Sequence, residues 1–268
     1  MKHLGKILIA AGALALSGMG HAAPVATWQA TTTGLWTAYS PNAGVTLSNA
    51  GKTLSWGNVA PANQSSLVIT NPGVQNFSTY LGTTPPQAAP YLANSVTLTH
   101  NNKVLPGGSP TLTSATLSVA LTLLATSPAG NPFGLQTINY DIRFVETPNT
   151  AGACADVNSP VPCNDIFVLL GNPLLNEKFT YTDGIDYFVN AFPLNGNVLS
   201  TLADNVCAAA GVANGCTGFT TVENQSNPLP FGLTISTAPL QVPEPGSLAL
   251  IGLALAGLGF VSRRRSAV

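Results

Sequence analysis

The stretch from Ile138 to Val145 reads INYDIRFV, and its side chains alternate between two kinds. Every second residue, beginning with Ile138 and ending with Phe144, is apolar, and the residues between them are Asn139, Asp141 and Arg143. An alternation of apolar and polar residues with a period of two is typical of a β-strand that buries one face. This stretch therefore favours an all-β interpretation of the chain.

Other short runs along the chain support the same interpretation. Leu117 to Leu124 alternates in a similar way, and Asp183-Gly184 between two strand-like runs predicts a hairpin turn. Few stretches have the spacing of a helix, and Leu199–Ala210 is the best candidate in the body. Many short strands joined by turn residues favour a β-sandwich or jelly-roll-like body. The other expected strands are Thr53–Trp56, Leu67–Thr70, Val96–Thr99, Ile166–Leu170, Lys178–Thr182, Tyr187–Ala191 and Phe231–Ser236.

The first 23 residues have the three parts of an export signal. Lys2 and Lys6 are positively charged, residues 7–16 are apolar, and small residues surround Ala22. This signal helix is too short to span a bilayer. We expect signal peptidase to remove residues 1–23. The body over residues 24–241 has no internal repeat or change of composition, so we expect one extracellular β-sandwich domain.

Residues 242–268 form a second segment with three parts. Val242, Pro243, Glu244 and Pro245 come first, residues 247–261 are uncharged and mostly apolar, and Arg263, Arg264 and Arg265 follow. As a helix the apolar part is roughly 22 Å long, and its flanking residues bring it nearer the ~30 Å of a hydrocarbon core. Arginines favour the cytoplasmic side. We therefore expect a C-terminal transmembrane helix that holds the protein in the inner membrane with its body outside.

This order of a Val242-Pro243-Glu244-Pro245 motif, an apolar helix and an arginine cluster resembles the PEP-CTERM sorting signal. Proteins with this signal are similar to substrates of exosortase, a membrane protease-transpeptidase of Gram-negative bacteria that make extracellular polysaccharide. The resemblance implies recognition at Pro243-Glu244-Pro245, removal of the helix and transfer to the cell surface or extracellular matrix. It covers about a tenth of the chain and implies a destination rather than an activity.

The composition of the body argues against several classes of function. Residues 24–241 contain four lysine or arginine residues and nine acidic residues, so a nucleic-acid partner is disfavoured. His100 is the only histidine there, which excludes a metal site with two histidines. A Gly-x-Ser-x-Gly elbow and a Gly-rich phosphate loop are both missing from the sequence. We expect no catalytic residues and no cofactor.

All four cysteines lie in the body, in two pairs of equal spacing. Cys154 and Cys163 bracket one loop of small and turn-forming residues, and Cys207 and Cys216 bracket another. An exported protein reaches an oxidising compartment, where such bonds persist. Zinc ligands usually stand two to four residues apart with histidine nearby, so a zinc site is disfavoured. We expect two local disulfides.

Thr99-His100-Asn101-Asn102 matches the pattern Thr-His-x-Asn. Together with the tail, it resembles the THxN family of PEP-CTERM proteins, and the body is similar to choice-of-anchor extracellular β-domains. This resemblance implies no activity. In the structural interpretation, a strand ends at His100, the asparagines turn the chain, and Asn102 pairs with backbone groups. In the functional one, His100 or Asn102 contributes to a ligand or calcium site.

The loop that ends at Asp165 contains more oxygen ligands than the Thr-His-x-Asn motif. It offers Asp156, Asn158, Asn164 and Asp165. Calcium prefers several carboxylate, amide and carbonyl oxygens. A calcium site that uses Asp156, Asn158 and Asp165 is therefore a hypothesis of the sequence.

The leading functional hypothesis is a non-enzymatic surface or matrix protein that is structural or binds glycans or other proteins. The first alternative is a secreted carbohydrate-active enzyme on a β-sandwich, which needs two carboxylates about 5–5.5 Å or 6.5–9.5 Å apart across a cleft. Asp183 and Asp186 are the most visible acidic pair, although aspartates there also suit a turn. Adhesion through a threonine-rich β face is a further alternative, for which the threonine pairs are short.

Overall fold

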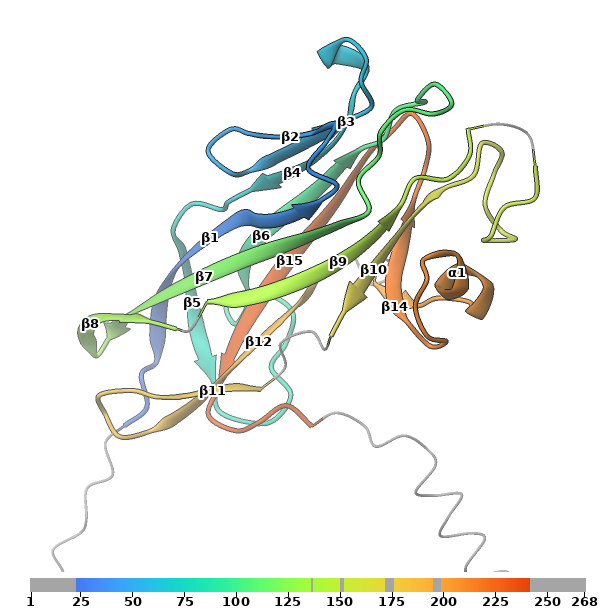
Figure 1. Cartoon of the computed structure of the whole chain (residues 1–268). Coiled ribbons are helices and arrows are strands. Elements are labelled where there is room, and N and C mark those ends of the chain that lie inside the picture. Colours follow the sequence, from blue (N-terminus) through green and yellow to red (C-terminus); the bar gives the residue numbers. More distant parts are fainter. Residues whose placement is uncertain (1–22, 136, 150–151, 172–175, 195–198, 242–268) are drawn as a thin grey trace, which may run out of the picture.

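The structure is a computed structural model that describes residues 23–135, 137–149, 152–171, 176–194 and 199–241 (Figure 1). The expected signal helix and the expected C-terminal transmembrane helix lie outside these residues. Within the described part of the chain, no helix combines the length and the apolar character needed to cross a membrane.

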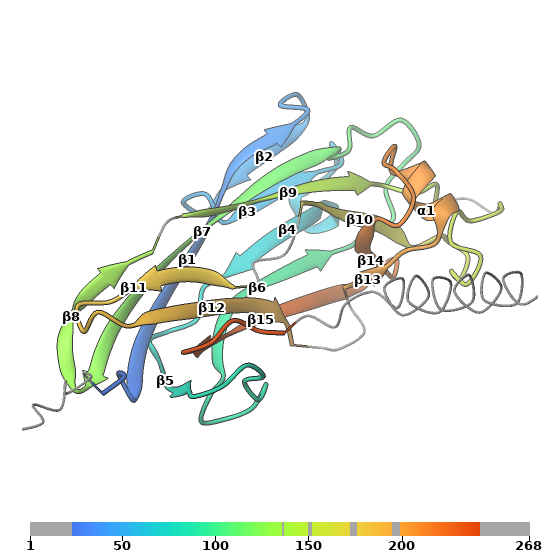
Figure 2. The same cartoon turned by 90° about the horizontal axis from the view of Figure 1, so that it is seen from below.

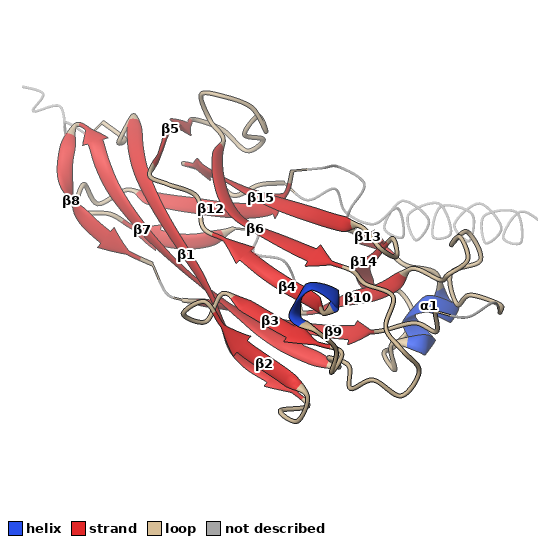
Figure 3. Cartoon of the chain, turned by 90° about the horizontal axis from the view of Figure 1, so that it is seen from above, coloured by secondary structure: helices blue, strands red, loops and turns tan. Residues whose placement is uncertain are grey.

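The prediction of an all-β protein is confirmed, because almost all regular structure in the described residues is β-strand (Figure 3). One layer follows the strand order β13-β14-β10-β9-β7-β1-β5, with β8 beside β7. Its strands are β1 (Thr27–Ser40), β5 (Gln75–Tyr80), β7 (Ser114–Ser127), β8 (Ala129–Gly134), β9 (Ile138–Val145), β10 (Asp165–Leu170), β13 (Ser200–Thr201) and β14 (Thr217–Thr221).

The second layer follows the order β15-β6-β4-β3-β2, with β12 beside β15 and β11 beside β12. β5 connects the layers, since it pairs antiparallel with β1 and parallel with β15. Short helices η1 (Pro61–Asn63) and α1 (Asp204–Ala209) complete the described elements. The second-layer strands are β2 (Val45–Ser48), β3 (Thr53–Trp56), β4 (Ser65–Thr70), β6 (Ala93–Asn101), β11 (Glu177–Thr180), β12 (Asp186–Pro193) and β15 (Ser226–Ser236).

The main core lies between the two layers, which face each other in Figure 2. Trp36 of β1 and Phe144 of β9 pack there with Leu98 of β6 and Leu229 of β15. Along β9, Ile142 and Phe144 are buried whereas the polar residues between the apolar ones are exposed. The alternation read from the sequence of β9 therefore correctly gives its buried face.

The sequence analysis missed β1, although it is 14 residues long. The inward positions in its middle are Ala30, Thr32 and Gly34, which are small or polar rather than bulky and apolar. A Cβ atom at Gly34 would lie 3.0 Å from Cγ1 of Val96, so the layers approach too closely there for a larger residue. Because the close packing requires small residues here, large apolar residues do not alternate along the middle of the strand, and the sequence gives no strand signal.

The helix expected over Leu199–Ala210 is confirmed only in its second half. Only Asp204–Ala209 is helical, and Ser200–Thr201 forms β13 against β14. The backbone N–H of Leu202 donates to the carbonyl of Cys216, which continues this pairing. Strand pairing with β14 therefore replaces the first helical turn.

Both expected disulfides are present. Cys154–Cys163 closes a loop before β10, and Cys207–Cys216 joins α1 to the start of β14. Val206 of α1 packs on Ile166 and Val168 of β10. The two bonds therefore restrain segments that flank β10 and β14, at the end of the sandwich where the acidic residues described next gather.

Candidate metal site

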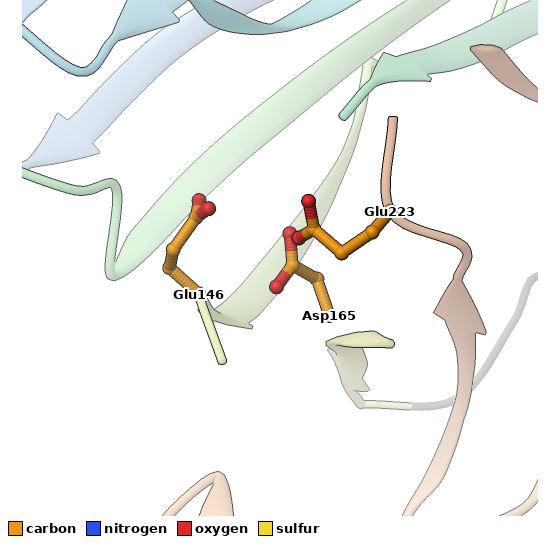
Figure 4. Close-up of side chains that lie close together, drawn as sticks. All are labelled: Glu146, Asp165 and Glu223. Carbon is orange, nitrogen blue, oxygen red and sulfur yellow. The ribbon is translucent and has the colours of Figure 1, made fainter. Parts of the chain in front are cut away.

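Three carboxylates from three neighbouring strands meet at one end of the sandwich (Figure 4). Glu146 directly follows β9, Asp165 begins β10, and Glu223 lies just after β14. One oxygen from each lies within 4.8 Å of the others. In Figure 4, Asp165 and Glu223 reach toward each other, and Glu146 approaches from the other side. This arrangement is typical of a cation site.

The antiparallel sheet brings these residues together. β10 lies between β9 and β14, with Ile166 opposite Val145 and Asp165 opposite Thr221. The end of β9, the beginning of β10 and the end of β14 therefore lie side by side at the same end of the layer. Two of the three acids are separated by 77 positions in the sequence, from Glu146 to Glu223, so only strand pairing makes them neighbours.

Asp165 is fully buried. Its Oδ1 accepts hydrogen bonds from the backbone N–H of Thr147 at 2.8 Å and from the Thr147 hydroxyl at 3.2 Å. Its Oδ2 is buried and has no hydrogen-bond partner. Desolvation, together with the nearby charge of Glu146, raises the pKa of Asp165 to about 9. Without a cation this carboxyl group is therefore protonated at neutral pH.

The other two carboxyl groups experience the same effects more weakly. Oε2 of Glu146 accepts a hydrogen bond from the Trp56 indole N–H at 2.9 Å, whereas its Oε1 is buried without a partner. Burial raises the pKa of Glu146 to about 7, and the charge of Glu223 adds to the rise. Burial also raises the pKa of Glu223. In the described part of the chain, no lysine or arginine forms an ion pair with these three acids.

Two asparagines add amide groups beside the carboxylates. Asn102 is fully buried, its amide hydrogen-bonds to Glu223, and its Oδ1 has no partner. The Asn149 amide lies 2.9 and 3.1 Å from the two carboxylate oxygens of Glu223. With its nitrogen toward Glu223, its oxygen accepts from the Leu105 N–H at 3.0 Å. The cluster thus combines carboxylate groups with two amide groups in one buried space.

The Thr-His-x-Asn motif lies beside this cluster but without the expected turn. β6 continues through Asn101, and the N–H of Asn102 donates to the carbonyl of Gln225. Pairing of β6 with both β4 and β15 keeps the chain extended there. Asn102 does pair with the backbone, through a 3.4 Å hydrogen bond to the carbonyl of Thr221. Half-buried Thr99 lies within β6.

His100 is buried and belongs to the core rather than to the acidic group. Its Nδ1 lies 2.8 Å from the hydroxyl of Thr221, and its ring stacks on Trp56 at 5.7 Å between centroids. Burial lowers the pKa of His100 to about 3, so the ring is neutral. The acidic group is formed by Glu146, Asp165 and Glu223 without His100.

The structure places the calcium candidates of the sequence analysis at different locations. Only Asp165 belongs to the acidic group. Asp156 accepts a hydrogen bond from the N–H of Asn158 at 2.9 Å, in the loop closed by Cys154–Cys163. Asn164 reaches the hydroxyl of Thr220 at 3.4 Å. The loop therefore supplies one member of the cluster, and its other acid forms a local turn.

Sequence reasoning missed Glu146 and Glu223. Each stands alone among uncharged neighbours, without the close spacing that a metal motif offers. The available signal was their position, since one follows the INYDIRFV run and the other follows the strand-like GFTT at 218–221. Acids placed at strand ends become neighbours when the strands pair.

Comparison with known protein families finds a match at the C-terminus. Residues 241–265 match the PEP-CTERM protein-sorting motif. The chain is therefore an exported protein targeted to exosortase. The motif indicates processing by exosortase and a membrane-associated sorting step. This match confirms the interpretation of the C-terminal segment as a PEP-CTERM sorting signal.

No curated protein matches the chain. The similarity of the body to THxN proteins and to choice-of-anchor domains stays a prediction, because the matched motif begins only where the body ends.

Proposed function

We propose that this PEP-CTERM protein is a non-enzymatic component of the cell surface or extracellular matrix of a Gram-negative bacterium. We further propose that its body binds extracellular polysaccharide through the outer face of β9, β7 and β1. The sorting motif at residues 241–265 carries the first part of the proposal, because exosortase substrates leave the cytoplasm. The signal peptidase and inner-membrane steps expected from both ends of the chain agree with it.

The outer face of these strands supports glycan binding. The Ser118 hydroxyl lies 2.8 Å from the Thr37 hydroxyl and donates to Oδ1 of Asn139 at 2.5 Å, so one polar row crosses three strands. In the next row, Thr116 donates to Oδ1 of Asp141 at 2.7 Å. Such rows present donors and acceptors in fixed positions, which suits the hydroxyl groups of a sugar.

A shallow depression at one corner of this face adds charged side chains. Thr116, Asp141 and Arg143 line it together. Arginine and aspartate supply charge-assisted hydrogen bonds. Protein groups of these kinds are suited to the hydroxyl groups of a pyranose. We therefore take this corner as the centre of the proposed glycan surface.

The alternative of a carbohydrate-active enzyme has less support. Asp165 is fully buried and Glu223 is 7% exposed, so a sugar ring does not fit between their carboxylates. Asp183 accepts hydrogen bonds from the Ile185 N–H and the Tyr187 hydroxyl, and Asp186 pairs with Lys178 at 2.7 Å. These aspartates hold a hairpin, as the turn interpretation of the sequence expects.

Retention of the exported protein on the polysaccharide of its own bacterium tests the binding proposal. The wild-type protein should be retained, and Asp141→Asn and Arg143→Ala should each weaken retention several-fold. Asp204→Asn, a change to an exposed acid on α1, is the control and should leave retention unchanged. Wild-type protein that passes through the matrix freely contradicts the proposal.

A separate measurement tests the destination. Mass spectrometry of the protein from native cells should find a mature C-terminus near Pro243-Glu244-Pro245, in material from the surface or matrix fraction. Full-length protein in the cytoplasmic fraction would exclude exosortase sorting.

A further inference from the structure

We propose that Glu146, Asp165, Glu223 and Asn102 form a calcium site that joins the two layers of the sandwich at one end. This proposal is independent of glycan binding, because it concerns buried groups on the other side of the sheet from the proposed glycan surface. It goes beyond the sequence hypothesis, which placed calcium at Asp156 and Asn158 together with Asp165.

The first observation is a set of buried oxygens without donors. Oε1 of Glu146, Oδ2 of Asp165 and Oδ1 of Asn102 all have no hydrogen-bond partner among the described residues. A buried acceptor without a partner costs roughly 1–3 kcal/mol, and folded proteins avoid this cost. Asn102 is not an acid, comes from a different strand and is fully buried, so its free oxygen points to a ligand independently of the acidic cluster.

The ligand chemistry favours calcium over other cations. All the available groups are carboxylate or amide oxygens, which suit a hard cation, whereas zinc prefers histidine and cysteine. Calcium–oxygen distances of about 2.3–2.6 Å place oxygens on opposite sides of the ion about 4.6–5.2 Å apart. The carboxylate oxygens lie within 4.8 Å of one another, which leaves room for one such ion between them. Magnesium needs shorter distances, near 2.0–2.1 Å.

The charge of the cluster also favours a cation, which can replace the protons on its carboxyl groups. Three acids share a space with no lysine or arginine paired to any of them in the described residues. Reversal of the Asn149 amide would direct its oxygen toward the same space, at the cost of its bond from Leu105. Glu146 is the least buried of the three acids and gives an ion access from solvent.

The position of the site gives calcium a structural role. Glu146, Asp165 and Glu223 come from the layer with β9, β10 and β14, whereas Asn102 follows β6 of the other layer. The Trp56 indole, on β3 of that second layer, already donates to Glu146. An ion bound here would thus link the two layers. It would also hold together the chain segments next to β10 and β14. Calcium outside the cell reaches the millimolar range that such sites use, so the body would be strengthened after export.

Calorimetric titration of the full-length exported protein with calcium chloride tests the proposal. Both disulfides must be formed, and the protein must first be stripped with a chelator. We expect one site per chain with a dissociation constant on the order of 10⁻⁴ M, and a higher unfolding temperature in calcium than in chelator. No heat and no change of unfolding temperature up to millimolar calcium would overturn the proposal, as would an equal response to magnesium.

Matched variants locate the site. Asp165→Asn and Glu223→Gln should weaken calcium binding at least tenfold, and Glu146→Gln provides a less buried variant if the first two do not fold. Asp156→Asn, in the same loop as Asp165, should bind calcium like the wild type. Loss of binding in Asp156→Asn with retention in Asp165→Asn would place the ion in the loop and refute the cluster.

Terbium luminescence gives a second, spatial test. Terbium replaces calcium at oxygen sites and is excited by a tryptophan close to it. Trp56 contacts Glu146, so Trp56→Phe should remove most of the sensitised emission, whereas Trp28→Phe should retain it. Emission that survives Trp56→Phe and is lost in Trp28→Phe would show that the ion binds elsewhere.

Discussion

The two ends of the sandwich differ in whether the buried polar atoms beside their central tryptophan have hydrogen-bond partners. At the end where β1 begins, the indole of Trp28 donates to the Thr79 hydroxyl at 2.8 Å, and the Tyr187 hydroxyl accepts from the Val25 N–H at 2.8 Å. Rings of Phe179, Tyr181 and Tyr187 surround Trp28 with centroids 5.0–5.9 Å away. The protein satisfies these polar atoms with its own groups.

At the other end, the indole of Trp56 donates to Glu146, and His100 stacks on the same indole ring. Here the acids Glu146 and Asp165 each keep one buried oxygen without a partner. The comparison shows that aromatic packing alone does not provide hydrogen-bond partners for the buried polar atoms beside it. The buried polar atoms that contact Trp28 and Tyr187 have partners within the protein, whereas the carboxylate end requires protons or a cation.

The largest expected effect comes from removing the centre of the Trp28 end. Trp28→Ala empties a fully buried site and should lower the free energy of unfolding by about 3–5 kcal/mol. The loss, measured by urea unfolding, should be the same with calcium and with chelator. A loss below about 1 kcal/mol would mean that this cluster does not hold the end together.

The carboxylate end should make stability depend on pH when cations are removed. Folded-state pKa values of about 7 for Glu146 and about 9 for Asp165 lie above their unfolded values near 4. The folded protein then retains protons that the unfolded chain has released, so stability falls as the pH rises from about 5 through 7 and toward 9.

We expect each of these two groups to lower the free energy of unfolding in chelator by about 2–4 kcal/mol between pH 5 and pH 8. Calcium should remove most of this slope, because it replaces the protons. Denaturant unfolding at a series of pH values measures both curves. A flat profile in chelator would contradict the burial of these carboxyl groups.

A smaller effect should follow from removing one hydroxyl at the Trp28 end. Tyr187→Phe leaves the buried Val25 N–H without an acceptor and removes the bond to Asp183. The expected cost is about 1–3 kcal/mol, unchanged by calcium. Thermal unfolding measures it, with Tyr80→Phe as a control for the loss of a half-buried tyrosine hydroxyl outside this network. Equal costs in both variants would show that the network adds nothing.

The smallest effect is expected for Asp156→Asn. Its side chain accepts a hydrogen bond from the Asn158 N–H, and an amide oxygen can replace the carboxylate in that role. Stability should change by less than about 0.5 kcal/mol, both with and without calcium. Parallel unfolding curves of this variant and the wild type check this expectation. A change in stability as large as that of Asp165→Asn would contradict the placement of Asp156 outside the acidic cluster.

The sequence predicted the fold class because bulky apolar residues alternate in strands such as β7 and β9. It failed where packing selects small residues, as at Ala30 and Gly34 of β1, and where strand pairing overrides helical spacing, as at Ser200. Cysteine spacing predicted both disulfides, since local loops leave little choice of partner.

The candidate site was only partly predictable. Asp165 and Asn102 were named from the sequence, but each was assigned to a different local arrangement. Glu146 and Glu223 were missed, since their proximity arises from the pairing of β10 with β9 on one side and with β14 on the other. From a single sequence, the positions of strands can be predicted more easily than which strands pair with each other.

The strands at the margins of the sheets are short. β13 has two residues, β2 and β11 have four each, and β8, with six, contains Pro132. Few unpaired N–H and C=O groups are thus open to a strand from another molecule, and the proline removes one further donor. Copies crowded together are therefore protected against open-ended growth into fibres, and any assembly among them must be built from side chains on the broad faces.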